Sequence, residues 1–225
     1  TINMTFANMG NSLQIKNAGR LAEEEKMIFD TTAWPIRSLF SELLKQEHLD
    51  FVKINDVFTL IQGFYFTKPS KEYTLIYSSF HKFHQTWSRY LEFADWWGFE
   101  NFRSEDYLKE EFNRKKIMSI AEQAYIAYAK KLLEGELIDP RSQERRIDKD
   151  KIQEFLPKLE TIIEKYPDYQ YPPYFKAKLL LSLGDGENGL SSFLPFAKQK
   201  KNDFWVWELM ADFYKDKKDI QLACY

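Results

Sequence analysis

The chain is poor in the residues and segments on which several common kinds of protein depend. Its 225 residues include a single cysteine, Cys224, which excludes an internal disulfide and a cysteine-built zinc site. No apolar stretch is long enough to span a bilayer, and the N-terminal stretch lacks the basic-then-apolar pattern of a signal peptide. We therefore expect a soluble cytoplasmic protein with no membrane partner.

Glycine, proline and an excess of charge of one sign are also scarce. The 8 Gly and 8 Pro are few for a sheet-rich protein with many tight turns. The 32 basic and 34 acidic residues leave a formal net charge of -2. This balance argues against a uniformly basic nucleic-acid-binding surface, although it leaves room for a local basic patch.

The usual motifs of catalysis and metal binding are missing from the sequence. There is no glycine-rich phosphate loop and no Gly-x-Ser-x-Gly turn, and Cys224 is remote in sequence from the three histidines. His81 and His84 have a helical spacing that could place both rings on one metal ion, but no acidic residue one turn away completes a site. We expect no cofactor, no metal and no enzymatic activity.

Apolar residues at helical spacing are abundant. From Trp34 onward they recur almost everywhere with the period of an α-helix, and aromatic residues make up 17% of the chain. The longest helix of the first half is expected over 70–97, and the next over 105–134 with a break near Asn113. The sequence therefore predicts an all-α fold, an α-solenoid of stacked antiparallel helical hairpins.

Composition along the chain predicts four segments. Residues 1–30 have mixed composition and are expected to be poorly ordered or peripheral. Residues 31–135 form an N-terminal helical array, and the polar stretch 136–150 is the best candidate for a linker because it shows no sustained period. Residues 151–225 form paired helices, the last pair being cut short at the C-terminus.

The last third of the chain carries a repeated spacing of large and small residues. A period of about 34 residues places Ala177 under Ala211 and Gly189 under Ala223. The last copy consists of Trp207, Met210, Ala211, Tyr214 and Ala223. On these residues, the segment 151–225 resembles the tetratricopeptide family, although the middle copy departs from the pattern at Pro173, Lys176 and Gly189. The resemblance implies a surface for partners rather than a reaction site.

A second, fainter resemblance covers residues 95–102 and 203–207. These stretches, Asp-Trp-Trp-Gly-Phe-Glu-Asn-Phe and Asp-Phe-Trp-Val-Trp, look like the uncharacterised helical region of bacterial proteins in TOTE conflict systems. In that family the region is joined to cold-shock or OB-type domains that are expected to bind nucleic acid. The resemblance implies a scaffold in a bacterial defence system, with any nucleic-acid contact made mainly by another domain.

The first resemblance also indicates where a partner would bind. Tetratricopeptide proteins often hold peptides on the concave face made by the first helix of each pair. The matching positions with candidate partner-binding side chains are Tyr174, Lys178, Trp205, Glu208, Asp212 and Lys215. Because Glu208 and Asp212 are acidic, the clamp that captures a peptide's C-terminal carboxylates is not expected. The predicted partner is a basic or mixed peptide.

Two further clusters admit both a functional and a structural interpretation. Trp96 and Trp97 could form a stacking platform or a partner-binding anchor, or they could fill a seam between helices with each indole N–H bonded to a nearby carbonyl. The structural interpretation is favoured. Two basic clusters could contact phosphate but are more typical of a helix C-terminus and a solvated loop. They are Lys198, Lys200 and Lys201, and Arg141, Arg145 and Arg146.

The sequence thus favours a non-enzymatic scaffold that binds a protein or peptide. The alternative is a nucleic-acid-associated module acting with an OB or cold-shock domain, and an enzyme without a recognisable motif is third. An exposed groove without Lys or Arg would favour the scaffold. Aromatic and basic side chains on one face would favour the nucleic-acid module.

Overall fold

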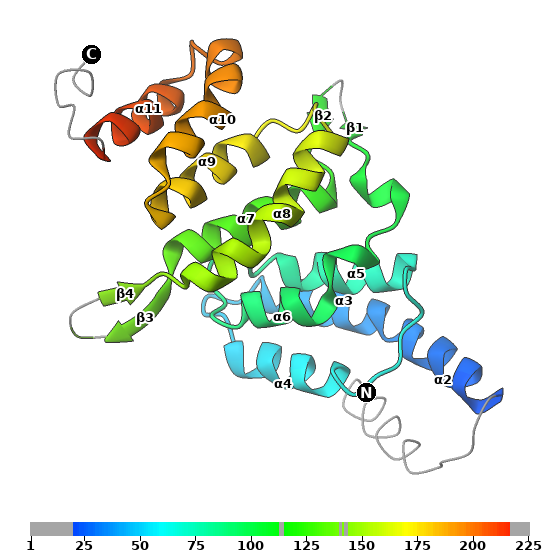
Figure 1. Cartoon of the computed structure of the whole chain (residues 1–225). Helices are drawn as coiled ribbons and strands as arrows, with labels where there is room; N and C mark the ends of the chain where they lie inside the picture. Colours follow the sequence, from blue (N-terminus) through cyan, green and yellow to red (C-terminus); the bar gives the residue numbers. More distant parts are fainter. Residues whose placement is uncertain (1–19, 113–114, 140, 142–143, 217–225) are drawn as a thin grey trace. The chain divides into compact units, whose positions relative to one another are not determined.

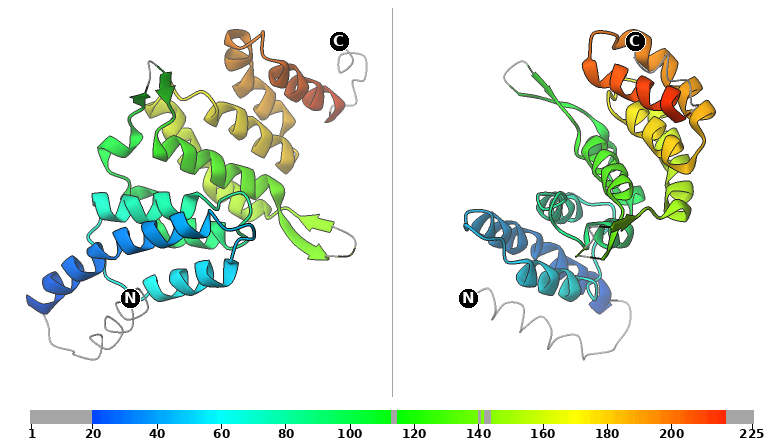
Figure 2. Two further views of the ribbon diagram at one scale, coloured as in Figure 1. Left: turned by 180° about the vertical axis from the view of Figure 1, so that it is seen from behind. Right: turned by 90° about the vertical axis from the view of Figure 1, so that its left-hand side faces the viewer.

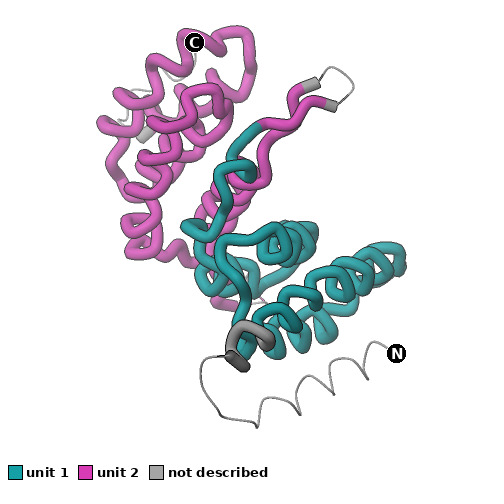
Figure 3. Tube along the Cα trace, turned by 90° about the vertical axis from the view of Figure 1, so that its right-hand side faces the viewer, with its two compact units in different colours: residues 1–108 teal, residues 109–225 magenta. Residues whose placement is uncertain are grey.

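Helices dominate the computed structural model, which describes residues 20–112, 115–139, 141 and 144–216 (Figure 1). Within those residues, strands are confined to two short antiparallel hairpins. The all-α prediction is confirmed. The chain divides into two units, residues 1–108 and residues 109–225, and each is considered by itself (Figure 3).

Unit 1 is built from short helices around an aromatic core. Its elements are α2 (Arg20–Thr31), α3 (Ala33–Leu43), α4 (Phe51–Ile61), α5 (Lys71–His81), α6 (Tyr90–Trp97), and the 3-10 turns η1 (Phe99–Asn101) and η2 (Ser104–Tyr107). Helix α3 packs against α5, and α2 packs against both. The segment 1–30, predicted to be peripheral, is described only from residue 20. There Phe29 is buried and its ring stacks on Phe64 at 4.5 Å.

The single helix predicted over 70–97 is in fact two helices, so that prediction was wrong. Ser70 caps α5 as expected, accepting a hydrogen bond from Tyr73 N at 3.0 Å, but α5 ends at His81. In a continuous helix, Phe80 and Phe93 would lie roughly 20 Å apart along the axis. The turn between α5 and α6 instead stacks their rings at 4.5 Å. Burial of aromatic surface therefore outweighs continuous helical hydrogen bonding here.

Unit 2 begins with a β-hairpin and continues as a series of helices. Its elements are β1 (Glu110–Phe112), β2 (Lys115–Ile117), α7 (Ile120–Glu134), β3 (Glu136–Asp139), β4 (Glu144–Arg146), α8 (Lys149–Lys165), α9 (Pro172–Leu183), α10 (Gly186–Gln199) and α11 (Phe204–Asp216). Helix α9 packs against α7, α8 and α10, and α10 packs against α11. Figures 1 and 2 show the two hairpins at opposite ends of the α7–α8 pair.

The predicted helix over 105–134 and the predicted linker over 136–150 both need correction. The helix begins only at Ile120, because β1 and β2 precede it. The polar stretch holds β3 and β4, which pair antiparallel with Glu136 opposite Arg146. Since α7 packs against both α8 and α9, the segment 136–150 connects paired helices rather than domains. The division between units falls after residue 108 instead.

Gly135 allows the β3–β4 hairpin to follow α7 directly. Gly135 follows α7 directly and has a φ of 70°, which side chains other than glycine rarely adopt. A Cβ at this position would lie 2.7 Å from the carbonyl oxygen of Arg146 in β4. The close approach of the two backbones at the start of the β3–β4 hairpin therefore requires glycine.

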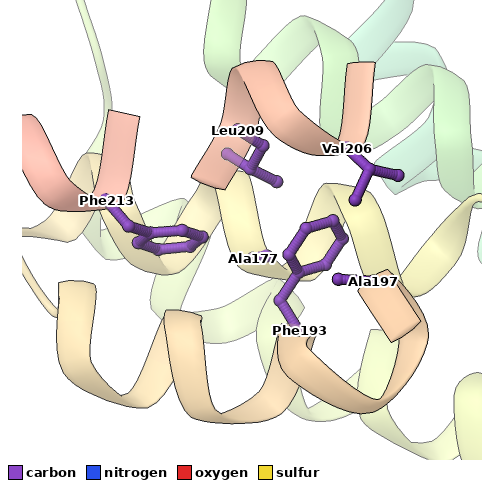
Figure 4. Close-up of a cluster of buried hydrophobic side chains, with 6 residues drawn as sticks. All are labelled: Ala177, Phe193, Ala197, Val206, Leu209 and Phe213. Carbon is purple, nitrogen blue, oxygen red and sulfur yellow. The ribbon is translucent and has the colours of Figure 1, made fainter. Parts of the chain in front are cut away.

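The C-terminal helices share a small apolar core, shown in Figure 4. Its buried members are Ala177, Phe193, Ala197, Val206, Leu209 and Phe213, contributed by α9, α10 and α11. Gly184 ends α9 with a left-handed conformation (φ 84°), which allows α10 to turn back along it. Of the repeated residues, Ala177 is buried in this core, whereas Trp207 is 57% exposed. Ala223 lies outside the described residues.

Candidate binding groove

A groove of about 680 Å³ opens on unit 2 along three of its helices, α7, α9 and α11. We call it the α7–α9–α11 groove. Its volume lies within the range of roughly 300–1,000 Å³ that is common for ligand-binding clefts. The lining residues are Met118, Ile126, Lys130, Leu133, Tyr171, Tyr174, Phe175, Lys178 and Trp205.

The spacing of the lining residues follows from helix geometry. On α7 they are Ile126, Lys130 and Leu133, separated by four and three residues. On α9, Tyr174 and Lys178 are separated by four residues. Such spacings place side chains on one face of a helix. Each of these two helices therefore contributes one stripe to the groove.

Trp205, from α11, closes one part of the wall through aromatic contacts. Its ring meets that of Tyr174 edge-to-face, with the centroids 4.9 Å apart, and lies 6.2 Å from that of Tyr171. Contacts of this kind add to the stabilisation from burial alone. Val206, the next residue, is buried in the core of Figure 4. The position of Trp205 in the wall therefore depends on the packing of α11 against α10.

Two lysines supply the formal charge among the described residues that line the groove. The Lys178 ammonium lies 5.3 Å from the centroid of the Tyr174 ring and donates to its hydroxyl at 3.4 Å. The Lys130 ammonium lies 5.6 Å from the centroid of the Phe175 ring. Both cations are thus held against aromatic faces, an attraction worth about 0.5–1 kcal/mol at exposed sites. Among the residues that the structure describes, no carboxylate lines the groove.

Neighbouring lysines outside the groove have acidic partners. Lys131 pairs with Glu134 at 2.8 Å, and Lys176 pairs with Glu160 at 2.9 Å. Across the part of the chain that the structure describes, no such ion pair forms at Lys130 or Lys178. The positive charge facing the groove is therefore not neutralised by the described residues of unit 2.

The predicted partner-binding residues of the repeat segment separate into two groups. Tyr174, Lys178 and Trp205 line the groove. Glu208 is exposed, and Asp212 forms an ion pair with Lys215 at 3.7 Å, but none of these three lines it. The expectation of a basic or mixed peptide rested on Glu208 and Asp212. The charge that does line the groove has the opposite sign.

Trp96 and Trp97 belong to unit 1, where they take part in packing. Trp97 is fully buried, stacks on Tyr73 at 4.9 Å and donates its indole N–H to the Tyr73 carbonyl at 3.1 Å. Trp96 is half-buried, and its ring lies 5.7 Å from that of Phe58. The interpretation of this cluster as a filled seam between helices is confirmed for Trp97.

His81 and His84 are also explained by packing within unit 1. Their rings stack at 4.6 Å, and His81 Nδ1 shares a hydrogen bond with the Tyr90 hydroxyl at 2.8 Å. Burial, followed by the positive charge of His84, lowers the pKa of His81 to about 3. His84 Nδ1 bonds the carbonyl of His81 at 2.8 Å. Within the described chain, no group of three or more potential ligands could hold a metal ion.

A second cavity of about 560 Å³ shares Met118 and Tyr171 with the groove. We call it the Glu122 cavity after the buried carboxyl group in its wall. Ser119 caps α7 by accepting from Glu122 N at 3.1 Å. In a capping box, the side chain of Glu122 would return to the start of its own helix. It instead accepts from the backbone N–H of Gln170 at 3.1 Å, which ties the α8–α9 connection to α7.

The other carboxyl oxygen of Glu122, Oε2, is buried without a hydrogen bond from the described residues, and the whole side chain is fully buried. The nearest cation is the Lys109 ammonium, 3.6 Å away, which also lies 3.4 Å from Asp168 Oδ2. Burial raises the pKa of Glu122, and the Lys109 charge opposes this only in part. Ionisation of the buried Glu122 carboxyl group therefore lowers the stability of the folded state.

The contribution of α7 to the groove was not predicted from the sequence. The predicted boundary at 136–150 placed α7 in the N-terminal array, apart from α9, so Ile126, Lys130 and Leu133 were not expected in the same site as Tyr174 and Lys178. The pattern Ser119-x-x-Glu122, typical of a helix start, would have placed the beginning of α7 correctly. No local pattern in the sequence indicated that α7 packs against α9.

Part of the chain matches a known protein family. Residues 170–225 match a domain of unknown function, DUF7017. The matched stretch includes α9, α10 and α11, and therefore Tyr171, Tyr174, Phe175, Lys178 and Trp205 of the groove. The curated proteins and the solved structures contain no significant match to the chain.

The helices were also compared with the requirements for crossing a membrane. Within residues 20–112, 115–139, 141 and 144–216, no helix has the length and apolar character of a transmembrane span.

Proposed function

We propose that this protein is a non-enzymatic helical scaffold that binds a segment of a partner protein in the α7–α9–α11 groove. The observation that carries the proposal is an open groove with aromatic and aliphatic walls and two lysines at which no ion pair forms among the described residues. A few oriented polar groups in an otherwise apolar cleft are typical of a recognition site. The tetratricopeptide resemblance of residues 151–225 supports the same use of the first helix of each pair.

A place for this scaffold in a bacterial conflict system is part of the proposal. It rests on the resemblance of residues 95–102 and 203–207 to the helical region of such proteins. In this arrangement, the groove would hold a partner while an attached domain performs the nucleic-acid contact.

The experiment is affinity purification of partners with the full-length protein, with and without nuclease. The groove variant is Met118→Glu with Tyr171→Glu. These side chains are 40% and 38% exposed, so the substitutions place charge in the wall without opening the core. The matched control is Leu137→Glu with Ile138→Glu, two exposed residues of β3 that do not line the groove. A stoichiometric partner that survives nuclease, is lost with the groove variant and is kept with the control is the expected result. Equal capture by both variants would refute the groove as the binding site.

A nucleic-acid-associated module is the second candidate function. Aromatic and basic side chains coincide in the groove, which is the arrangement that the sequence-based expectation gave as favouring this module over the scaffold. Single-stranded nucleic acid binds by stacking of bases on aromatic rings and by contacts of cations with phosphate. However, Tyr174 and Trp205 already pack against each other, and Lys130 lies against the face of Phe175. Because these groups already contact one another within the protein, the scaffold is proposed first. Partners that disappear on nuclease treatment, together with nucleic acid in the eluate, would establish this candidate in place of the first.

A further inference from the structure

We propose that the segment bound in the α7–α9–α11 groove is acidic, with carboxylates that pair with Lys130 and Lys178 and an apolar side chain between them. This inference rests on the proposed function and assigns the chemical class of its partner. It differs from the expectation drawn from the sequence, which was a basic or mixed peptide.

The lining of the groove carries charge of one sign. In the part of the chain that the structure describes, Lys130 and Lys178 are the only charged residues that line it. The acidic side chains expected there from the repeat spacing, Glu208 and Asp212, are not part of the lining. A ligand of negative charge is therefore complementary to this surface, and a basic ligand would be repelled.

The ammonium groups of Lys130 and Lys178 are positioned by aromatic rings. Each is held against an aromatic ring, at 5.3 Å for Lys178 and 5.6 Å for Lys130. This restricts the positions of both long side chains before a ligand arrives. Preorganisation reduces the conformational entropy that binding would otherwise cost. Lys131, one residue along α7, is paired with Glu134 and is not available in the same way.

Apolar side chains line the groove beside the lysines. Ile126 and Leu133 of α7 and Phe175 of α9 belong to this lining, and Ile126 and Phe175 are already buried. A ligand that carried only charge would leave Met118 and Tyr171, which are 40% and 38% exposed, in contact with water. An aliphatic or aromatic side chain between the acidic residues would gain about 25 cal/mol for each Å² of apolar surface that it buries.

The test measures the affinities of short fluorescent peptides for the full chain. One peptide alternates glutamate and leucine. The second replaces each glutamate with glutamine, the third replaces each glutamate with lysine, and the fourth replaces each leucine with alanine. A labelled oligodeoxythymidine of the same charge as the first peptide is the nucleic-acid probe.

The protein variants separate the groove from the rest of the surface. Lys130→Glu with Lys178→Glu reverses the charge of the groove. Lys158→Glu with Lys198→Glu makes the same change of net charge at exposed sites on α8 and α10 that do not line it. Circular dichroism and thermal unfolding of both variants confirm that the fold is kept.

The glutamate–leucine peptide should bind more tightly than the alanine peptide, because leucine buries more apolar surface. It should bind about tenfold more tightly than the glutamine peptide, as two ion pairs of about 1 kcal/mol or less permit, and the lysine peptide should bind more weakly still because the groove repels it. Reversal of the groove charge should remove this advantage, whereas the control variant should keep it. Added salt should weaken the binding, because the charges are partly exposed.

Three results would overturn the inference. Equal binding of the glutamine peptide, still abolished by Met118→Glu with Tyr171→Glu, would leave the groove as a binding site but reject an acidic partner. Tighter binding of oligodeoxythymidine, with competition between the two probes, would assign the lysines to nucleic acid. Failure of every peptide to bind would reject the acidic segment, and partner capture by the groove variant would then decide the proposed function separately.

Discussion

Replacement of Phe193 with alanine should detach α11 from the α9–α10 hairpin. The Phe193 ring is fully buried in α10 and lies among Ala177, Val206 and Leu209 (Figure 4). It also lies 6.4 Å from the ring of Phe213, at the other end of the α10–α11 contact. The side chain thus occupies the centre of the only apolar cluster that the described residues place between these helices.

The expected loss of stability has two parts. Removal of a buried phenyl group forfeits about 2–3 kcal/mol of transfer free energy. A residual cavity of roughly 100 Å³ would cost about 2 kcal/mol more at 24 cal/mol per Å³. The sum, about 4–5 kcal/mol, lies within the range of roughly 3–5 kcal/mol for phenylalanine to alanine in a core. It is a large fraction of the roughly 5–15 kcal/mol that stabilises a typical domain.

Hydrogen exchange measured by mass spectrometry can locate this loss. Amides of α11 should exchange up to about a thousandfold faster in the variant, since each 1.4 kcal/mol corresponds to a factor of about ten. Amides of α5, in unit 1, should not change. Phe193→Leu is the matched control and should cost only about 1 kcal/mol because it retains most of the apolar volume.

A change of less than tenfold in α11 exchange would show that Phe193 does not hold this helix. It would also remove the basis for placing Trp205 in the wall of the groove, since that placement depends on the packing of α11. Peptide affinity of the variant, measured with the probes described above, should fall together with α11 protection.

Three further predictions follow from buried polar groups. Because the folded-state pKa of His81 is about 3, below its ordinary value of 6.5, stability should fall as pH decreases below 6.5, by about 2 kcal/mol at pH 5. His81→Gln should flatten this dependence in urea titrations. Asp106 is buried and accepts from Arg103 N at 2.9 Å and from Thr74 Oγ1, so Asp106→Ala should cost about 3 kcal/mol in chemical denaturation, and Asp106→Asn should cost less. The folded-state pKa of Glu122 is raised, so its ionisation opposes folding above pH 4.5. The urea midpoint of Glu122→Gln should therefore rise relative to wild type as pH increases from 4 to 7, and a constant difference would contradict this.

Helical elements were predictable where the apolar period is long and the caps are explicit. Ser70 began α5 as expected, and the indole of Trp97 bonds a backbone carbonyl as the structural interpretation required. The errors fell at features without a strong local pattern. The turn between α5 and α6 interrupts a continuous apolar stripe, and β3 and β4 are too short and polar to alternate visibly.

The candidate site was predictable only in part, for a related reason. Of the residues that repeat spacing selected as partner-binding, Tyr174, Lys178 and Trp205 line the groove. It also selected Glu208 and Asp212, because a spacing specifies a face only when the neighbouring helix is known. Because Glu208 and Asp212 do not line the groove, the charge of its described lining is positive and not negative.

The sequence by itself determined that this chain is helical, since the apolar period and the scarcity of glycine and proline act locally on each segment. Only the tertiary structure decided which helices share a surface. A β-hairpin separates α7 from α8 along the chain, yet α7 packs against α9, which begins 38 residues after α7 ends. Packing between elements so distant in sequence is set by the burial of apolar surface, which no single segment encodes. For that reason Lys130 and Lys178 face the same groove, although the sequence places them in different helices.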